Sequence, residues 1–194
     1  MSERKDLEII AGLVPRGSRV LDLGCGDGTL LAQLQAERGC TGYGIELDDA
    51  NVLASTQRGI NVIQLNLEDG LALFDDGSFD VVLQLDTLQH LRHTEHMLRE
   101  TARVGRIGIV SFPNFAHWPN RLHVALGRMP VTRVLPYEWY DTPNIRVGTY
   151  ADFEILARKD GLTILDAFGI QAGRTVRTLP NLLASVAVFK FESA

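Results

Sequence analysis

The sequence predicts an α/β fold with a doubly wound, mostly parallel sheet of seven strands. Short apolar or β-branched runs alternate with segments of helical periodicity along most of the 194 residues. A glycine-rich turn stands at the end of the first apolar run. Such alternation is typical of sheets that helices cover on both faces. Several of the runs are almost continuously apolar, as expected of strands buried on both faces.

The seven apolar runs give the expected strands. In chain order they are residues 19–23, 42–46, 61–65, 79–85, 107–112, 162–168 and 185–191. Helices are expected at 29–38, 49–58 and 95–104. One more is expected to begin after Thr149, whose hydroxyl can cap the backbone at Asp152, and to end near Gly161. The apolar residues expected to face the sheet are Leu30, Leu31 and Leu34, then Met97, Leu98 and Ala102, and finally Phe153, Leu156 and Ala157.

Residues 113–148 interrupt this alternation. Five of the seven prolines fall there, together with both tryptophans and two of the four tyrosines, and no clean period survives. A connection of this length in a compact domain is usually a functional cover or a recognition element. Because the apolar runs resume after it, residues 1–194 are expected to form one domain with an aromatic and proline-rich excursion at 113–148.

Composition and charge exclude several classes of protein. The chain has 19 Lys and Arg against 24 Asp and Glu, a net charge of −5, and 45% hydrophobic residues, which is typical of a soluble globular domain. Mild acidity argues against a nucleic-acid backbone as the principal partner. No apolar run approaches the roughly 18 residues of a membrane span, and the first residues lack the order of a secretory signal. A cytoplasmic protein without a membrane partner is expected.

Metal binding is not expected. Cys25 and Cys40 lie in no metal-ligand spacing, and two cysteines make no disulfide framework. His90, His93 and His96 follow each other at steps of three, so on a helix the first and last would diverge by about 120°. No cysteine or carboxylate stands in register to complete a site with them.

The strongest local motif is DLGCGDG at residues 22–28, between the first strand and the first helix. In a parallel sheet this turn opens onto the crevice where ligands bind, and glycine lets a ligand approach the backbone closely. The spacing is GxGxG rather than the GxGxxG of dinucleotide-binding proteins. Asp22 and Asp27 flank the glycines, and their charges favour a ligand that carries positive charge. The alternative is a tight turn that binds nothing.

Two further strand ends complete a candidate nucleoside site. Glu46 ends the second strand, where a carboxylate can accept hydrogen bonds from both ribose hydroxyls. Leu47 offers an apolar contact to a base. After the third strand, the Asn66 side chain and the backbone of Leu67 are placed to contact the edge of an adenine. These features describe a site for a ribonucleoside without a phosphate chain.

These motifs resemble those of the class I S-adenosylmethionine-dependent methyltransferases, including FDVV at 79–82. The resemblance implies their Rossmann-like fold and S-adenosylmethionine or S-adenosylhomocysteine as cofactor. The cofactor-binding residues that it implies are Asp22, Gly24, Cys25, Gly26, Glu46, Leu47, Asn66, Leu67 and Leu85. Asn66 stands where that family more often has aspartate, so the charge-assisted contact to adenine is absent.

The second half of the chain resembles the methionine biosynthesis protein MetW family more closely. The segments that carry this resemblance are DTLQ at 86–89, VGR at 104–106, FPNF at 112–115, HW at 117–118, GRMP at 127–130, LPY at 135–137, WY at 139–140, TPNI at 142–145 and PNLL at 180–183. The resemblance implies a bacterial cytoplasmic protein of methionine biosynthesis, usually acting alongside the homoserine O-acyltransferase MetX. Arg146 stands where histidine is expected, which puts a proton-transfer role there in doubt.

The catalytic residues stay unassigned, because methyl transfer needs chiefly alignment of the reactants and a base only if the acceptor must lose a proton. Gln89 and His90 are candidates for the floor of an acceptor pocket, with His90 as a base. Alternatively, they begin the next helix and face solvent. The aromatic candidates for an acceptor pocket, lid or partner surface are His117, Trp118 and Tyr137. Their alternative is a small core beneath the excursion.

Three functions remain open on these grounds. The leading hypothesis is a MetW-like protein that binds S-adenosylmethionine or its demethylated product and supports homoserine O-acyltransferase. Whether the chain is itself an enzyme is left open. The rival is an autonomous S-adenosylmethionine-dependent methyltransferase that acts on a small molecule. A nicotinamide-dependent dehydrogenase comes third, because the glycine spacing argues against it.

Overall fold

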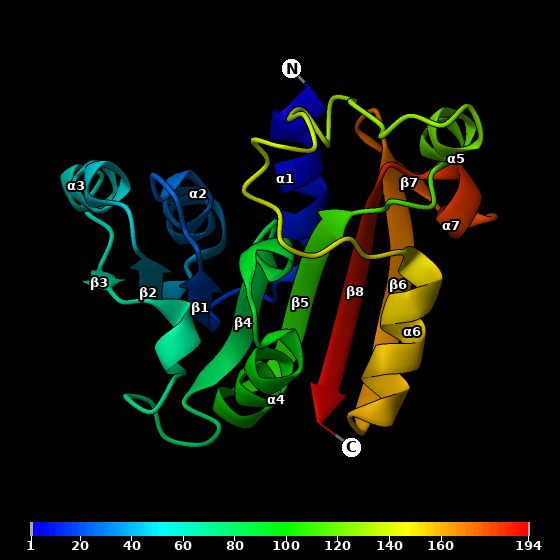
Figure 1. Ribbon diagram of the computed structural model, residues 1–194. Helices are drawn as coiled ribbons and strands as arrows, with labels where there is room; N and C mark the ends of the chain where they lie inside the picture. Colours follow the sequence, from blue (N-terminus) through cyan, green and yellow to red (C-terminus); the bar gives the residue numbers. More distant parts are fainter. Residues whose placement is uncertain (1, 194) are drawn as a thin grey trace.

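A central eight-stranded sheet organises the computed structural model, which describes residues 2–193 (Figure 1). The strands are β1 (Arg19–Leu23), β2 (Thr41–Glu46), β3 (Val62–Gln64), β4 (Phe79–Leu85), β5 (Gly105–Pro113), β6 (Leu162–Gln171), β7 (Arg174–Val176) and β8 (Val186–Ser193). Their order in the sheet is β3-β2-β1-β4-β5-β8-β6-β7. All seven predicted strands are present, with ends that move by up to three residues.

The direction of the strands confirms the doubly wound α/β prediction. Strands β1 to β5 pair in parallel, and β8 lies antiparallel between β5 and β6. The strand order reverses between β1 and β4, and ligands of such sheets bind in the crevice at this switch point. Asp22 of β1 is in register with Gly44 of β2 and Leu83 of β4.

The predicted number of seven strands is wrong by one. Strand β7 pairs antiparallel with β6 through a tight turn in which Ala172 and Gly173 both have positive φ, 50° and 75°. A strand of three residues is too short to show an alternating pattern in the sequence. It adds an edge to the sheet on the side away from the glycine-rich turn.

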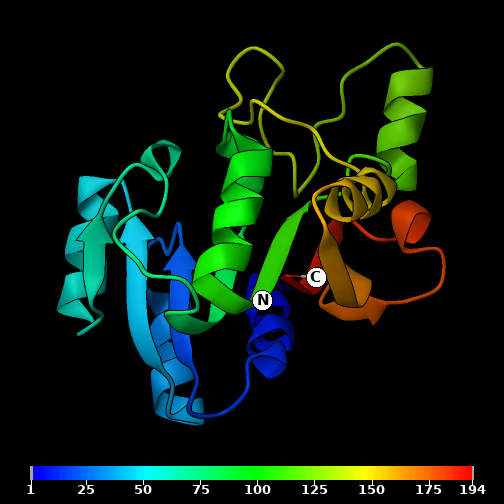
Figure 2. The same cartoon turned by 90° about the horizontal axis from the view of Figure 1, so that it is seen from below.

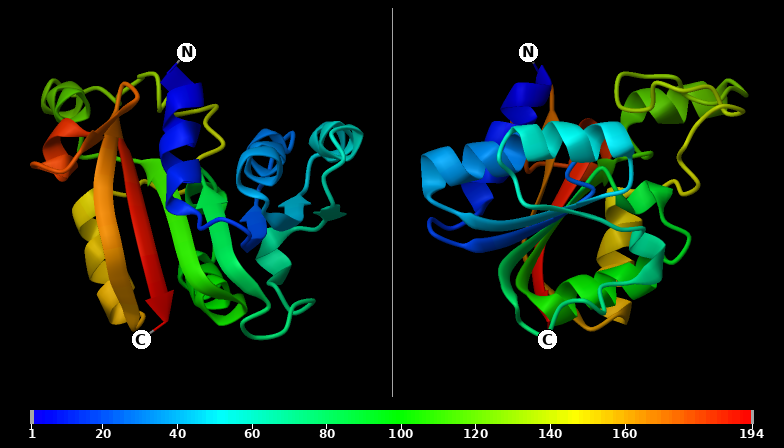
Figure 3. Two further views of the ribbon diagram at one scale, coloured as in Figure 1. Left: turned by 180° about the vertical axis from the view of Figure 1, so that it is seen from behind. Right: turned by 90° about the vertical axis from the view of Figure 1, so that its left-hand side faces the viewer.

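Helices cover both faces of the sheet (Figure 3). Helices α1 (Ser2–Leu13), α2 (Thr29–Arg38) and α3 (Asp49–Gln57) lie on one face, and α4 (Thr94–Val104) and α6 (Tyr150–Lys159) on the other. Seven of the nine side chains predicted to face the sheet are buried in its two apolar cores, among them Leu34 and Phe153, and the other two, Ala102 and Leu156, are partly buried against the core that contains Phe153. The cap of α6 is as predicted, since Oγ1 of Thr149 accepts from the backbone N–H of Asp152 at 3.1 Å.

Helix α1 was not among the predicted elements. Its apolar residues Leu7, Ile10 and Ala11, together with Val14 just after its end, follow the helical spacing i, i+3, i+4, i+7 and pack against the sheet. The helical spacing is therefore present in the sequence, although the sequence analysis tests this segment only as a secretory signal. Within residues 2–193 no helix combines the length and the apolar character that crossing a membrane requires.

The excursion contains a helix that the sequence pattern did not reveal, α5 (Trp118–Ala125), with Pro119 in its first turn, where proline is tolerated. Figure 2 shows α5 and the connection after it projecting beyond the sheet. Both ends of the excursion are fastened by Asn114, which is fully buried. Its Nδ2 donates to the carbonyl oxygen of Ala184 at 2.9 Å, and its Oδ1 accepts from the backbone of Tyr150 at 3.2 Å.

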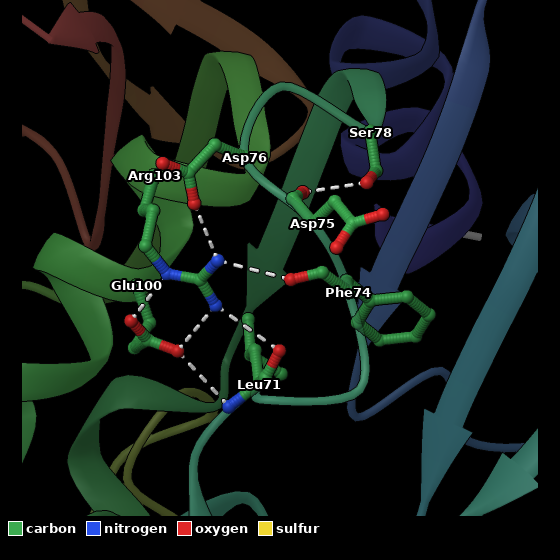
Figure 4. A network of polar contacts seen from close by, with 7 residues as sticks. All are labelled: Leu71, Phe74, Asp75, Asp76, Ser78, Glu100 and Arg103. Atoms are coloured by element: carbon green, nitrogen blue, oxygen red, sulfur yellow. Dashed lines mark hydrogen bonds and ion pairs between the residues drawn. The ribbon is translucent and has the colours of Figure 1, made fainter.

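The connection between β3 and β4 is held against α4 by an arginine cluster (Figure 4). Arg103 pairs with Glu100 through Nε at 2.7 Å and with Asp76 through Nη1 at 2.7 Å. It also donates to the carbonyl oxygens of Leu71 and Phe74 at 3.1 and 2.9 Å. This connection begins with the short helix η1 (Leu67–Asp69), so the cluster also steadies the chain at the edge of the predicted adenine site.

Candidate functional site

The glycine-rich turn between β1 and α2 has the backbone that the motif predicts. Gly24, Gly26 and Gly28 have φ values of 81°, 56° and 76°, a region that side chains rarely adopt. The backbone N–H groups of Gly24 and Cys25 donate to the carbonyl oxygen of Ile45 at 2.8 and 3.0 Å, which ties the turn to the end of β2. A Cβ added at Gly26 would meet no atom within 4 Å. That side of the turn is therefore open to a ligand.

Glu46 lies directly against this turn. Its Oε2 accepts from the backbone N–H of Gly26 at 2.8 Å, while Oε1 accepts from the backbone N–H groups of Leu47 and Asp48 at 2.8 and 3.0 Å. The carboxylate is thus held between the turn and the start of α3. The Leu47 side chain beside it is 58% exposed, which leaves an apolar surface for a base.

Asp22 is buried beneath the turn. Its pKa is raised to about 7, first by burial and then by the negative charge of Glu46. Within residues 2–193 no side chain or backbone N–H donates a hydrogen bond to it. A buried carboxyl beside a second carboxylate, with no donor of its own, is suited to a ligand that brings a positive charge.

The expected contribution of Asp27 is corrected by the structure. Arg58 pairs with its carboxylate and donates through Nε to its carbonyl oxygen at 2.8 Å. A hydrogen bond from Thr29, followed by the charge of Arg58, holds the pKa of Asp27 below its usual range. Because its charge is compensated, the negative field at the turn comes from Asp22 and Glu46.

Cys25 packs below the turn. Its thiol lies so close to Gly44 that an added Cβ there would come within 2.3 Å of Sγ, and Oγ of Ser55 is 3.9 Å away. Burial and the charge of Asp22 raise the pKa of the thiol to about 12. The side chain is therefore a neutral packing group and not a nucleophile.

The remaining predicted cofactor residues stand at the same edge of the sheet. Asn66 is exposed, and its Oδ1 accepts from the backbone of Glu68 at 3.0 Å as it begins η1. The Leu67 side chain is buried in the core, so only its backbone is free to face a ligand. Leu85 is half-buried at the end of β4.

Gln89 and His90 lie in the short helix η2 (Leu88–His90), whereas α4 begins only at Thr94. The alternative that both begin the next helix and face solvent is therefore wrong for Gln89, whereas His90 does face solvent. Gln89 is 8% exposed and lines a cavity of about 600 Å³. His90 is exposed, with Nδ1 at 3.2 Å from the carbonyl oxygen of Pro143.

The aromatic candidates do not join this cavity. His117 is buried, and burial lowers its pKa, but Trp118 and Tyr137 are about half exposed, at 52% and 49%. None of the three is among the residues that line the cavity with Gln89. Of the three, only His117 is buried, as the alternative of a small core beneath the excursion expects.

Thr87 is a residue of the site that the sequence did not single out. Its Oγ1 donates to the carbonyl oxygen of Leu23 at 2.8 Å, and a Cβ added at Gly24 would come within 2.7 Å of it. Thr87 thus joins the glycine-rich turn to η2 and to the cavity beyond. Thr87 lies in the DTLQ segment, but the residues around it in the sequence do not indicate its contact with the distant glycine-rich turn.

The sheet order, the open glycine-rich turn and the acidic end of β2 define a class I methyltransferase fold. Magnesium protoporphyrin IX methyltransferase from Synechocystis PCC 6803, solved with bound S-adenosylhomocysteine, shares this fold with a TM-score of 0.70 at 19% identity. The match covers all of this chain and 84% of that one.

The chain belongs to the MetW family, because the family model described as methionine biosynthesis protein MetW matches residues 4–191. It is 38% identical over 200 residues to the bifunctional methionine biosynthesis protein MetXA/MetW of Rhodopirellula baltica, a match that covers 96% of this chain and 32% of the relative. The chain thus spans about a third of that relative's length. It is also 30% identical to the ubiquinone biosynthesis O-methyltransferase of Pseudomonas fluorescens, over 79% of this chain and 68% of that one.

Proposed function

We propose that the chain binds S-adenosylmethionine or S-adenosylhomocysteine at the glycine-rich turn and supports homoserine O-acyltransferase, MetX, in the bacterial cytoplasm. The single observation that carries the binding proposal is the Glu46 carboxylate, which is held against the backbone of Gly26 at the open side of the turn. On this proposal residues 1–194 act as one domain.

Each residue has a definite task in this site. Glu46 accepts hydrogen bonds from the ribose hydroxyls, and Gly24 and Gly26 let the methionine part approach the backbone. Asp22 stabilises the positive charge of the ligand. The contacts to adenine come from Leu47, Asn66, the backbone of Leu67 and Leu85. Cys25 supports the turn from below. When bound, S-adenosylmethionine supplies an electrophilic methyl group on a sulfonium centre.

The partnership with MetX is supported by the fused relative. The name of the Rhodopirellula baltica protein places a MetXA part and a MetW part in one polypeptide, and fusion raises the effective concentration of two modules that act together. A MetW chain that binds the nucleoside product of the methionine pathway can regulate the acyltransferase in response to the concentration of that product. Such regulation requires that the nucleoside and the partner change each other's affinity for the chain.

Calorimetric titration tests both parts of the proposal. The chain is titrated with S-adenosylmethionine and S-adenosylhomocysteine, alone and mixed with homoserine O-acyltransferase. We expect binding of the nucleoside and an affinity that the partner changes. Acyltransferase activity that is the same with and without S-adenosylmethionine in the complex would contradict the regulatory part, and the absence of binding heat at several temperatures would contradict the nucleoside site.

An autonomous methyltransferase is the second candidate. It is supported by the cavity of about 600 Å³ next to η2 and by the similarity to a ubiquinone biosynthesis O-methyltransferase. This function predicts that S-adenosylhomocysteine forms only when a particular acceptor is present. A Gln89→Ala variant should then lose turnover while it still binds the cofactor. Turnover unchanged in that variant would argue against the cavity as the acceptor site.

A further inference from the structure

The cavity that Gln89 lines lies outside the proposed nucleoside site. It is lined by η2, the beginning of α4, the end of β5, the last residues of the excursion and α6, and it is open to solvent on one side. None of the nine predicted cofactor residues lines it. Its apolar walls are formed by Leu88, Phe112, Phe115, Leu135 and Phe153. At about 600 Å³ it has the size of a site for a small molecule.

Gln89, which lines this cavity, carries a buried acceptor without a partner among residues 2–193. Nε2 of Gln89 donates to the carbonyl oxygen of Asp86 at 2.8 Å, which fixes the orientation of the side-chain amide. Its Oε1 is buried and accepts no hydrogen bond from any residue in the range 2–193. A buried acceptor without a donor is destabilising, because it has lost its hydrogen bonds to water. A ligand with a hydroxyl or N–H group would remove that destabilisation.

The chain that closes the cavity is fastened to the same residue. The backbone N–H groups of Ile145 and Arg146 both donate to the carbonyl oxygen of Gln89, at 2.9 and 3.0 Å. Nη2 of Arg146 then donates to the carbonyl oxygen of Arg92 at 3.0 Å. These bonds bring the side chain of Arg146 to the part of the wall that Arg92 forms.

No carboxylate forms an ion pair with the side chain of Arg92 or Arg146 within residues 2–193, and Glu68 accepts only from the backbone N–H of Arg92. The other arginine of the wall, Arg99, differs, because it pairs with Glu95 and Asp160, both at 3.3 Å. Glu95 pairs in addition with a lysine of α6. Asp152, the other acid of the wall, is held by a hydroxyl at the start of α6. Two guanidinium groups are therefore available to an anion, and planar guanidinium groups bind carboxylates well.

We propose that this cavity binds a small organic acid with an apolar body and a hydroxyl or amino group. The carboxylate is held by Arg146 and Arg92, the body packs against the phenylalanine and leucine walls, and the hydroxyl or amino group donates to Oε1 of Gln89. The site stands independently of the nucleoside site. It is nevertheless adjacent to it, because Thr87 in front of η2 contacts the glycine-rich turn.

Ligand-observed NMR titration of the full chain tests this proposal with three related probes. They are 3-phenylpropionate, its neutral amide 3-phenylpropionamide, and 3-phenyllactate, which adds a hydroxyl group next to the carboxylate. We expect both acids to bind at least about tenfold more tightly than the amide, because the amide lacks the charge that the guanidinium groups recognise. Adipate and hexanoate extend the test to acids without an aromatic ring.

Three variants assign the contacts. Arg146→Gln and Arg92→Gln should each weaken the acids about fivefold or more and leave the amide unchanged. Gln89→Met should remove the advantage of 3-phenyllactate over 3-phenylpropionate without abolishing the binding of either. Arg106→Gln is the matched control, because Arg106 is exposed on β5 and only approaches Asp80 at 4.0 Å.

The comparison of acids with the amide needs only the wild-type chain, so it decides the question even if a variant fails to fold. The proposal is overturned if none of the acids binds at millimolar concentration, or if the amide binds as well as its acid. Loss of binding in Arg106→Gln as large as in Arg146→Gln would also overturn it. None of these outcomes depends on whether S-adenosylmethionine binds.

Discussion

The backbone N–H of Gly26 and Oε2 of Glu46 are joined by a hydrogen bond of 2.8 Å. The bond connects the turn after β1 to the end of β2, so two segments 20 residues apart hold each other in position. The other oxygen of Glu46 is held by Leu47 and Asp48. A carboxylate oriented in this way needs no rearrangement to receive the two hydroxyls of a ribose, which lowers the entropic cost of binding.

Removal of this carboxylate should abolish nucleoside binding. Hydrogen bonds to charged groups contribute about 1.5–3 kcal/mol each, so Glu46→Ala should weaken S-adenosylhomocysteine binding by about a hundredfold or more. Glu46→Gln keeps one acceptor oxygen and should weaken it about tenfold. Calorimetric titration measures both. Glu37→Ala is the control, because the Glu37 side chain is exposed and its carboxylate accepts from Gln33 on the same helix. Equal affinity of Glu46→Ala and wild type would exclude the ribose contact.

Asp22 should make the stability of the chain depend on pH. Its pKa is about 7 in the folded chain, above the ordinary 3.8 of an aspartate in water, so the folded chain binds the proton more tightly than the unfolded one. The resulting stabilisation is complete below about pH 4 and is lost as the pH rises to about 7. The shift corresponds to up to about 4 kcal/mol. Urea unfolding measures the free energy of unfolding of both proteins from pH 4 to pH 8. As the pH rises, wild type should lose stability relative to Asp22→Asn. If the difference in unfolding free energy between the two proteins does not change with pH, Asp22 is not a buried carboxyl that titrates in this range.

The same group should couple nucleoside binding to protons. A positively charged ligand favours ionised Asp22, so binding should lower its pKa and release a proton. The affinity for S-adenosylmethionine should therefore rise between about pH 5.5 and 7.5 in wild type and stay level in Asp22→Asn. Calorimetry in two buffers of different ionisation enthalpy counts the protons released. Proton uptake on binding would reverse the sign of this argument.

The sequence predicted best what depends on local pattern. The strands buried on both faces, the capping of α6 by Thr149 and the turn from Gly24 to Gly28 all follow from neighbouring residues, and the structure has them. Contacts between distant segments leave no local signal. The pairing of Asp27 with Arg58, 31 residues away, and the contact of Thr87 with Gly24 arise only when the sheet is assembled.

The structure of the excursion was also only partly predictable from the sequence. Helix α5 was not predicted, because the segment is rich in proline and aromatic residues and the helix is too short to give a clear helical period. Gln89 was a candidate from its place after β4, but the cavity around it depends on Arg146, more than 50 residues further on. The sequence drew attention to Arg146 only as a departure from a motif. Its position beside Arg92 needed the fold.

The arginine cluster at the connection into β4 should contribute measurably to stability. Figure 4 shows Arg103 facing Glu100, Asp76 and two backbone carbonyl groups. Its hydrogen bond is also the main cause that holds the pKa of Glu100 below its usual range. Arg103→Ala removes the ion pair of the partly buried Glu100 carboxylate and leaves the carbonyl oxygen of Phe74 without a donor, so it should lower the free energy of unfolding by about 2–3 kcal/mol. Urea unfolding measures this loss.

Arg106→Ala provides the comparison for that measurement. Its side chain is 76% exposed and lies 4.0 Å from Asp80, so the loss should stay below about 0.5 kcal/mol. Similar losses in the two variants would mean that the Arg103 contacts are no stronger than an exposed ion pair. Arg103→Lys should fall between them, because an ammonium group cannot reach all four acceptors together.

Asn114 should be the residue on which the excursion depends most. It is fully buried, and its amide contacts both ends of the excursion as well as the turn before β8 through Ala184. Asn114→Ala removes these bonds and leaves buried backbone groups unpaired, which should cost about 2–4 kcal/mol of unfolding free energy. Asn61→Ala, at an exposed position directly before β3, should change it by less than about 0.5 kcal/mol. Limited proteolysis should cut Asn114→Ala within residues 113–148 much faster than wild type, because its anchors are lost. Cleavage elsewhere in the chain at an equally raised rate would instead indicate general unfolding, and would show that Asn114 does not hold the excursion in particular.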